Sequence, residues 1–297
     1  MTYSIVARDA DSGELGVAVQ SHWFSVGTVV SWAEAGVGAV ATQAHADPAY
    51  GPRGLALMRA GRTAAEALAT LVAADRDASR RQVAMVDARG HVAVHTGGNC
   101  IALAGHATAD GVSVQANMMA SEAVWPAMLA AYRAAPGPLS GRLLAALDAG
   151  EAAGGDVRGR QSAALLVVSA TPSGRPWEDR RVDLRVEDGR DPLGELHRLL
   201  ALRRAYERAD RAELLELRGD VEGALAELRA ARELAPGADE HTFWEALLLA
   251  RSGRVDEGRA LLAPLVLEHA GWAQLLRRLP AAGRFPDDPG LIARLLA

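Results

Sequence analysis

The sequence predicts an α+β protein in which a sandwich of two β-sheets between helices, an αββα arrangement, is followed by a small all-α region. Two observations carry this prediction. Before residue 190, short runs of alternating apolar residues are interrupted twice by pairs of helical segments. Beyond residue 190 the pattern is wholly helical and contains an internal repeat. We therefore expect an αββα domain at residues 1–190 and a helical-repeat domain at residues 191–297.

The expected elements follow from the spacing of apolar residues, which has a period of two in strands and 3.6 in helices. Turn residues separate the strands, as at Asp11-Ser12-Gly13 in an N-terminal hairpin. The stretch Thr63-Ala64-Ala65-Glu66 is a capping box that begins a helix. The expected strands cover residues 4–8, 15–19, 26–30, 36–43, 82–87, 91–96, 100–105, 112–117, 162–169 and 181–186, and the expected helices cover residues 52–59, 63–73, 121–134 and 141–152.

The helical region contains two related segments. Gly219-Asp220-Val221-Glu222 recurs 34 residues later as Gly253-Arg254-Val255-Asp256. This is the period of tetratricopeptide repeats, and Pro236 stands where such a repeat ends. Because there are only about two repeats, we expect them to pack against the helix that begins at Pro192 or against the first domain.

Composition and charge exclude several classes of protein. The 297 residues are 49% hydrophobic and 23% charged, and the formal net charge is −5, so neither a nucleic acid nor a membrane is expected as a partner. The first residues lack a basic segment followed by an apolar run, which predicts a cytoplasmic protein. Cys100 is the only cysteine, which excludes an internal disulfide and zinc sites built from cysteines.

All 32 basic residues are arginines. No lysine is therefore present to act as a base or to form a Schiff base. The spacing of the histidines fits no compact pair of metal ligands, so we expect neither a metal nor another cofactor.

Thr2 is the most informative position of the chain. Threonine at position two is small enough for routine removal of the initiator methionine. Thr2 would then carry a free α-amine beside its hydroxyl, and the amine, with a pKa of about 8, would be a usable base for a nucleophilic hydroxyl. Many proteins begin with Met-Thr without consequence, so this hypothesis depends on its context. Ser4 is a fallback nucleophile only if processing occurs further along the chain.

A polar cluster precedes a strongly apolar predicted strand and consists of Asp156, Arg158, Gln161 and Ser162. An Asp-Arg pair at a strand edge can orient an α-amine or bind a substrate carboxylate. The alternative is a turn that is held together by a salt bridge. The sequence leaves both interpretations open.

Three further polar residues lie at the ends of predicted strands. Gln43 ends a glycine-rich segment that would let a substrate approach closely, or that packs tightly against a helix. Asn117 precedes a helix, so it either caps that helix, a role open also to Ser121, or lines a pocket. Ser21 follows the second strand and borders the site or lies at the surface.

Several motifs are spread over about the first 190 residues, namely Thr2–Asp9, Gly13–Val19, Gly36–Gln43, Pro48–Gly54, Val114–Met119, Gly154–Ala164 and Val182–Val186. Together these motifs resemble the "domain of unknown function 1028" family. That family is grouped with the Ntn hydrolases, so the resemblance implies an αββα sandwich, and members often carry a C-terminal extension.

The proteasome-like branch of the Ntn hydrolases uses an Asp and a Lys beside the N-terminal Thr. Asp156 is similar to the Asp of its late Asp-x-x-Ser-Gly element, with Arg158-Gly159 in place of Ser-Gly. The Lys has no counterpart here. An arginine or a polar amide would therefore have to supply the electrostatic field near the nucleophile.

We accordingly predict an amidohydrolase that acts on a small amide or peptide-like substrate through an acyl-enzyme. The alternative is a non-catalytic assembly or binding protein, in which the sandwich is a scaffold and the repeats contact a protein partner. The open edges of the sandwich and the short repeat stack favour a homo-oligomer. The predicted catalytic residues are Thr2 and Asp156, and the predicted substrate-binding residues are Ser21, Gln43, Asn117, Arg158, Gln161 and Ser162.

Overall fold

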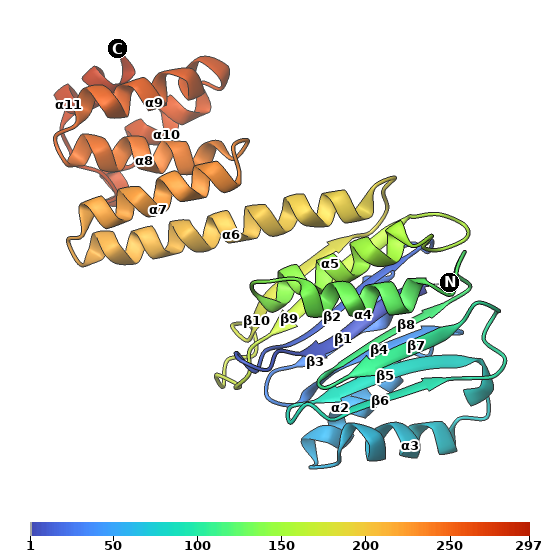
Figure 1. Ribbon diagram of the computed structural model, residues 1–297. Coiled ribbons are helices and arrows are strands. Elements are labelled where there is room, and N and C mark those ends of the chain that lie inside the picture. Colours follow the sequence, from blue (N-terminus) through green and yellow to red (C-terminus); the bar gives the residue numbers. More distant parts are fainter. Residues whose placement is uncertain (1) are drawn as a thin grey trace. The chain divides into compact units, whose positions relative to one another are not determined.

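The structure is a computed structural model that describes residues 2–297 (Figure 1). The chain forms two compact units, which divide between Arg198 and Leu199. The first unit contains two antiparallel sheets with helices, and the second is helical. The mixed α and β character and the helical C-terminal region are therefore confirmed. We expected a domain boundary at residue 190, and the division between the units lies within a helix that begins at Pro192.

Two antiparallel sheets form the centre of the first unit. The six-stranded sheet has the order β10-β9-β2-β1-β8-β7, and the four-stranded sheet has the order β3-β4-β5-β6. The N-terminal strand β1 thus lies inside the larger sheet, between β2 and β8. The strands are β1 (Thr2–Arg8), β2 (Leu15–Ser21), β3 (Ser31–Glu34), β4 (Gly38–Ala44), β5 (Arg81–Asp87), β6 (Val92–Thr96), β7 (Gly105–Ala109), β8 (Val112–Asn117), β9 (Ser162–Val168) and β10 (Arg180–Val186).

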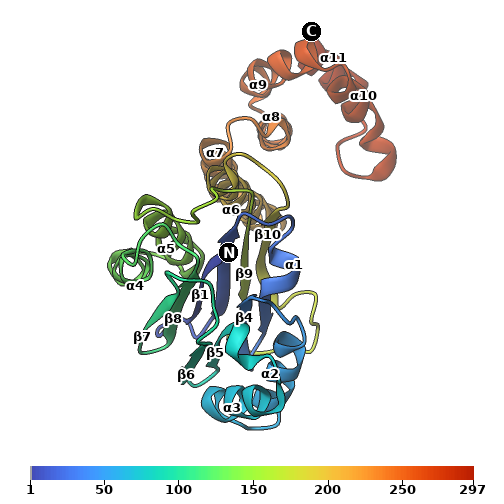
Figure 2. The same cartoon turned by 90° about the vertical axis from the view of Figure 1, so that its right-hand side faces the viewer.

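Helices cover the outer face of each sheet (Figure 2). Helices α4 and α5 contact the six-stranded sheet, and α2 and α3 contact the four-stranded sheet. The layers therefore run helix, sheet, sheet, helix. The predicted capping box begins α3, because the Thr63 hydroxyl accepts from Glu66 N and the Glu66 carboxylate accepts from Thr63 N. The helices of this unit are α1 (Gly27–Val30), α2 (Tyr50–Arg59), α3 (Ala64–Ala74), η1 (Ala78–Arg80), α4 (Val124–Ala134) and α5 (Leu139–Ala152).

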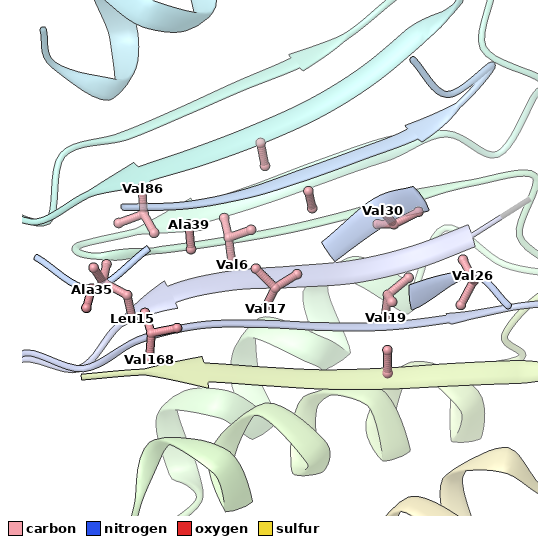
Figure 3. Packing of buried hydrophobic residues seen from close by; sticks show 13 residues of the cluster. Val6, Leu15, Val17, Val19, Val26, Val30, Ala35, Ala39, Val86 and Val168 are labelled. Atoms are coloured by element: carbon pink, nitrogen blue, oxygen red, sulfur yellow. The ribbon is translucent and has the colours of Figure 1, made fainter. Parts of the chain in front are cut away.

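An apolar core fills the space between the two sheets (Figure 3). Val17 and Val19 of β2 pack there with Val86 of the facing sheet. The alternate residues of β2 face the helical layer, where a Cβ on Gly16 would meet Leu143 of α5. Both faces of β2 are covered, which is why all seven of its residues are buried.

Two predicted strands are wrong. Residues 26–30 form a helical turn, α1, in which Val30 N donates to Val26 O at 3.0 Å. Valine-rich sequence favours strands, but Val26 N is held by the Ser162 hydroxyl at 3.0 Å, which sets the chain in a turn. Residues 100–104 form a loop, and the edge strand β7 begins only at Gly105. Strand β3 was not predicted as a separate element.

The second unit consists of helices and has two apolar clusters. The repeated segments both precede helices, since α7 begins at Val221 and α9 at Val255. The repeated glycines Gly219 and Gly253 have φ of 81° and 88°, a left-handed conformation that favours glycine after a helix. The helices after β10 are α6 (Pro192–Leu217), α7 (Val221–Leu234), α8 (Asp239–Arg251), α9 (Val255–Glu268), α10 (Gly271–Arg278), η2 (Pro280–Ala282) and α11 (Pro289–Leu296).

Within residues 2–297, no helix combines the length and the apolar character that a membrane crossing requires.

The close packing of α2 on β3 predicts that Gly51→Ala destabilises the protein. A Cβ at Gly51 would overlap the Trp32 indole, which is partly buried. Such overpacking costs about 1–3 kcal/mol, against a gain of at most about 1 kcal/mol in helix propensity. Chemical denaturation should therefore show a lower free energy of unfolding. Gly98→Ala, where a Cβ meets no atom within 4 Å, is the control. Equal stability of the two variants would contradict this account of the packing.

Candidate functional site

Six strand ends meet at one end of the sandwich. Strand β1 begins there, and its antiparallel neighbours β2 and β8 end there, so Thr2 lies opposite Asn117 and one residue beyond the pair Tyr3–Gln20. Strand β9 begins beside the end of β2. In the other sheet, the end of β4 pairs with the start of β5. Five predicted site residues stand at these ends, namely Thr2, Ser21, Gln43, Asn117 and Ser162.

Thr2 is held by side chains from three strands. Its hydroxyl oxygen lies 3.0 Å from the hydroxyl oxygen of Ser21, and either group can donate. The Thr2 carbonyl accepts from Gln43 Nε2 at 3.2 Å and from Asn117 Nδ2 at 3.3 Å. Thr2 is only 5% exposed. Both its hydroxyl and its carbonyl are therefore fixed in position.

Asn117 does not cap the following helix. The capping interpretation is wrong because the Asn117 amide donates inward to Thr2, and the N-terminal residue of α4 has no side-chain cap. The Ser121 hydroxyl accepts instead from Ala123 N at 3.1 Å, just before that helix.

Buried amides link the two sheets around Thr2. The Gln82 side-chain oxygen accepts from Gln43 Nε2 at 2.7 Å and from Asn117 Nδ2 at 3.0 Å. The Gln82 amide nitrogen donates to Ala116 O at 2.9 Å, so each side of this amide is bonded. The Ser4 hydroxyl donates to Gln43 Oε1 at 2.6 Å. We refer to Gln43, Gln82 and Asn117 as the amide network.

Sequence reasoning missed Gln82 and Gln115 and considered Ser4 only as a fallback nucleophile. All three residues are completely buried. Their signal is a polar residue at a position of an apolar strand that faces the core, which native proteins keep only when it is hydrogen-bonded. Gln82 Nε2 donates to Ala116 O, 34 residues away, and Gln115 Nε2 donates to Ser4 Oγ, 111 residues away, so no local pattern identifies these bonds.

The Asp156 carboxylate anchors the chain beside Ser21. Its Oδ2 accepts from His22 N at 3.1 Å and its Oδ1 from Arg158 N at 2.9 Å. The Arg158 guanidinium pairs with the same carboxylate, with Nη2 3.2 Å from Oδ2. The Asp156 side chain has no exposed surface, whereas 36% of the Arg158 side chain is exposed. The predicted Asp-Arg pair is therefore present, and its arginine reaches solvent.

Gln161 and Ser162 make contacts that hold the start of β9. The Gln161 amide donates to Asp188 at 3.0 Å on the surface, while Gln161 N donates to Ser21 O at 3.2 Å. The Ser162 hydroxyl accepts from Val26 N and donates to Trp23 O. Neither side chain has a bond to Thr2 that the structure describes.

Strained backbone is concentrated at this end of the unit. Within residues 2–297, four residues other than glycine have positive φ: Ser25 at 54°, Ala44 at 67°, Leu103 at 55° and Met118 at 59°. They follow β2, end β4, precede β7 and follow β8. Each costs about 1–2 kcal/mol, and such residues cluster at functional sites.

Five exposed apolar side chains lie in the segments after β2, before β7 and before β9. Leu103 O accepts from Met119 N at 3.2 Å, and Met119 forms an isolated β-bridge with Asp156, so these loops are joined. Exposed apolar groups on neighbouring segments favour a contact surface for a ligand or a protein. We call this set the apolar rim, and it consists of Trp23, Phe24, Ile101, Leu103 and Val157.

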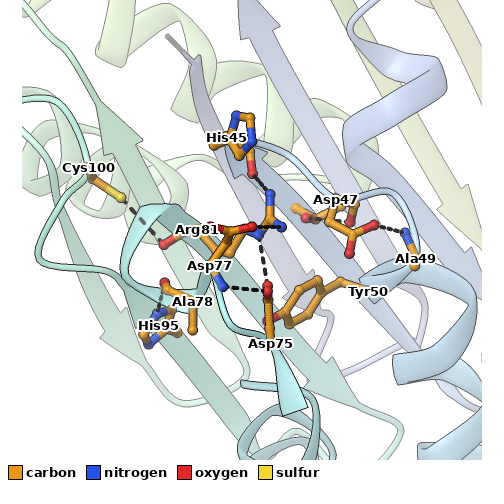
Figure 4. Close-up of polar contacts among 11 residues, drawn as sticks. His45, Asp47, Ala49, Tyr50, Asp75, Asp77, Ala78, Arg81, His95 and Cys100 are labelled. Atoms are coloured by element: carbon orange, nitrogen blue, oxygen red, sulfur yellow. Dashed lines mark hydrogen bonds and ion pairs between the residues drawn. The ribbon is translucent and has the colours of Figure 1, made fainter. Parts of the chain in front are cut away.

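An ionic cluster fixes the turn that follows Gln43 (Figure 4). Arg81 Nε donates to Asp75 Oδ2 at 2.8 Å, and Arg81 Nη1 donates to His45 O at 2.5 Å. The hydrogen bond from Arg81 lowers the pKa of Asp75 to about 2. Because Arg81 directly precedes Gln82, this cluster also positions the amide network.

Cys100 is not an activated nucleophile. Its Sγ lies 3.4 Å from Arg81 O, and burial raises the pKa of the thiol (Figure 4). A catalytic thiolate requires the opposite shift. Within residues 2–297, no group of three or more His, Cys, Asp or Glu side chains is arranged to hold a metal ion.

Comparison with known proteins identifies the class of the first unit. The family model described as "Family of unknown function (DUF1028)" matches residues 2–196. The chain belongs to this family, which confirms the predicted resemblance. The crystal structure of protein SPO2555 from Silicibacter pomeroyi, labelled with the same family model, is similar, with a TM-score of 0.61 and 31% identity over 67% of this chain and 87% of that chain. No curated protein matches the sequence.

The amide network predicts that Gln82→Met strongly lowers the free energy of unfolding. This substitution keeps the side-chain volume and removes both polar groups of the amide. The Gln43 and Asn117 amides would lose an acceptor in a buried setting, at a total cost of about 2–4 kcal/mol. Denaturant unfolding measures this loss. Gln161→Met, at the surface, is the matched control and should change stability by less than about 0.5 kcal/mol. Similar losses in both variants would show that the network is not stabilising.

The lowered pKa of Asp75 predicts how the stability of the protein depends on pH. Its pKa is lowered in the folded state, so it contributes stability above its unfolded pKa of about 4 and loses that contribution as the pH falls toward 2. Asp75→Asn should cost about 2 kcal/mol at neutral pH, and the difference from wild type should shrink below pH 4. Asp77→Asn, whose side chain is 58% exposed, is the control. A difference that does not change with pH would contradict the assignment.

Proposed function

We propose that the first unit is an amidohydrolase with the αββα sandwich of the Ntn hydrolases and that Thr2 is its nucleophile. The observation that carries this proposal is the fixed position of the Thr2 hydroxyl, 3.0 Å from Ser21 Oγ, at the end where the strained loops gather. The order of the layers and the family's grouping with the Ntn hydrolases support it. The proposed substrate is a small amide or a peptide-like molecule.

The reaction begins after Met1 has been removed. The Thr2 hydroxyl attacks the carbonyl carbon of the amide, and the α-amine of Thr2 takes the hydroxyl proton. The resulting tetrahedral intermediate collapses to an ester on Thr2, and the ammonium group passes the proton to the leaving amine. Water then hydrolyses the ester, again with the α-amine as the base, and releases the acid.

The surrounding residues have distinct proposed roles. Ser21 positions the nucleophilic hydroxyl through its hydrogen bond. Gln43 and Asn117 are positioning residues, because their amides hold the Thr2 carbonyl. Asp156 orients Arg158, and Arg158 faces solvent, where it supplies positive charge for an anionic group of the substrate. Gln161 and Ser162 hold the chain around this pair rather than contact the substrate.

The apolar rim suggests the character of the substrate. Trp23 and Phe24 directly follow His22, whose backbone is bonded to Asp156. An apolar group of the substrate would cover these side chains while its amide reaches Thr2. Burial of apolar surface contributes about 25 cal/mol per Å², so one aromatic contact is enough to select such substrates.

A second candidate is a non-catalytic binding protein that uses the sandwich as a scaffold. The low exposure of Thr2, 5%, favours this candidate, since a nucleophile must be reached by its substrate. The apolar rim would then contact a protein, including a second copy of this chain. The two candidates differ in the chemical state of the N-terminus and in the effect of mutating Thr2.

Intact-mass measurement and two substitutions test the proposed chemistry. We expect the native chain to lack Met1 and to hydrolyse members of a library of chromogenic amides with aromatic or aliphatic acyl groups. Thr2→Ala should reduce kcat/KM by at least about 10³-fold, because the nucleophile is lost. Thr2→Ser keeps a hydroxyl and should retain measurable activity.

Thermal unfolding of each variant provides the folding control. Retention of Met1, or equal activity of wild type and Thr2→Ala, would overturn the mechanism. An inert wild type across the whole library would favour the scaffold instead.

A further inference from the structure

A groove in the second unit combines aromatic side chains with carboxylates. Its volume is about 870 Å³, at the upper end of the range of small-molecule sites. One wall is a stripe of α6 that includes Tyr206, Asp210 and Glu213, spaced by three or four residues on one helix face. The other is a face of α8 with His241 and Trp244. The loop before α11 adds Phe285.

Two of the four carboxylates in this groove are neutralised by arginines of the chain. Glu216 Oε1 lies 2.8 Å from Arg251 Nη2, and Glu213 Oε1 lies 3.6 Å from Arg284 Nη2. These are the two arginines that line the groove. The remaining lining carboxylates therefore give the groove a net negative charge.

Asp210 and Glu240 carry that charge. Neither has an ion-pair partner in the part of the chain that the structure describes. Glu240 is oriented by two aromatic groups, because it accepts from the Tyr206 hydroxyl at 2.9 Å and from Trp244 Nε1 at 3.3 Å. Its carboxylate is thus held at the aromatic surface without a cation.

Arg284 shows how a guanidinium fits this surface. Its Cζ lies 5.9 Å from the centre of the Trp244 ring, and the same guanidinium pairs with Glu213. Arginine is suited to this combination because its planar group stacks on aromatic rings while its N–H groups bind carboxylates. Asp210 and Glu240, which line the same groove, lack such a guanidinium among the described residues.

His241 is a buried polar group of the groove without a partner. It is 1% exposed, and neither ring nitrogen has a hydrogen bond among the described residues. The Tyr206 ring meets it edge to face, with ring centres 4.8 Å apart. Burial lowers the pKa of His241, which favours the neutral imidazole over the cation that would oppose a cationic ligand. A ligand that donates a hydrogen bond would satisfy an otherwise unpartnered acceptor.

We propose that this groove binds an arginine-bearing segment of a partner protein. The guanidinium pairs with Asp210 and Glu240 and stacks on the neighbouring aromatic rings, as Arg284 does on Trp244. The groove is larger than a single arginine side chain requires. Its volume therefore favours a peptide over an isolated cation. This inference does not depend on the chemistry proposed for Thr2.

Fluorescence polarisation with the full chain tests this site. The probe is a short labelled peptide with two arginines in a glycine-serine background, and matched peptides carry lysine or glutamate instead. We expect binding in the order arginine, lysine, glutamate, with no detectable binding of the glutamate peptide. The double variant Asp210→Asn/Glu240→Gln should weaken binding of the arginine peptide about tenfold, since two charge pairs are lost.

The control variant is Asp256→Asn/Glu268→Gln, which removes the same number of carboxylates from α9, outside the groove. It should leave the affinity unchanged, and circular dichroism should show that both variants fold. An equal loss in the two double variants would reduce the effect to overall charge and overturn the proposal. Equally tight binding of free arginine, or no binding of the arginine peptide, would also overturn it.

Discussion

The site depends on one buried constraint, the amide network that joins the two sheets beside Thr2. The Gln82 amide is bonded on both sides, since its oxygen accepts from Gln43 and Asn117 and its nitrogen donates to Ala116 O. A buried polar group of this kind is tolerated only when its partners are in place, and in a low dielectric those bonds are strong. The spacing of the sheets and the position of the Thr2 backbone are thereby set together.

The two ends of the space between the sheets are filled differently, and this explains why the end beside Thr2 has a fixed geometry. Further from Thr2, the space between the sheets is filled by aliphatic side chains such as Val6, Val17 and Val86. Non-directional packing tolerates small shifts of one sheet against the other, whereas hydrogen bonds do not. The directional contacts and the strained loops occur at the same end of the unit. A site built there rests on strands rather than on loops alone, and this gives it a fixed geometry.

The sequence predicts most of the elements because their apolar periods are strong, and it predicts the α3 cap and the Asp156–Arg158 pair because both are local. It fails where a distant partner decides the structure. The turn at residues 27–30 depends on Ser162, 136 residues after Val26. The Asn117 amide donates inward to Gln82, so the alternative that Asn117 caps the following helix is wrong. Pairing across two sheets, which no local pattern encodes, creates the site.

The absence of lysine shapes the chemistry that this geometry can support. Arginine stays protonated at any relevant pH, so Arg158 can attract an anion but cannot exchange a proton. In the proposed mechanism, proton transfer at Thr2 therefore falls to its own α-amine, which exists only after Met1 is removed. The contacts that fix Thr2 reach its hydroxyl and its carbonyl. Neither group is altered when the preceding peptide bond is cleaved, so the network can hold the proposed nucleophile in the same place before and after the proposed processing.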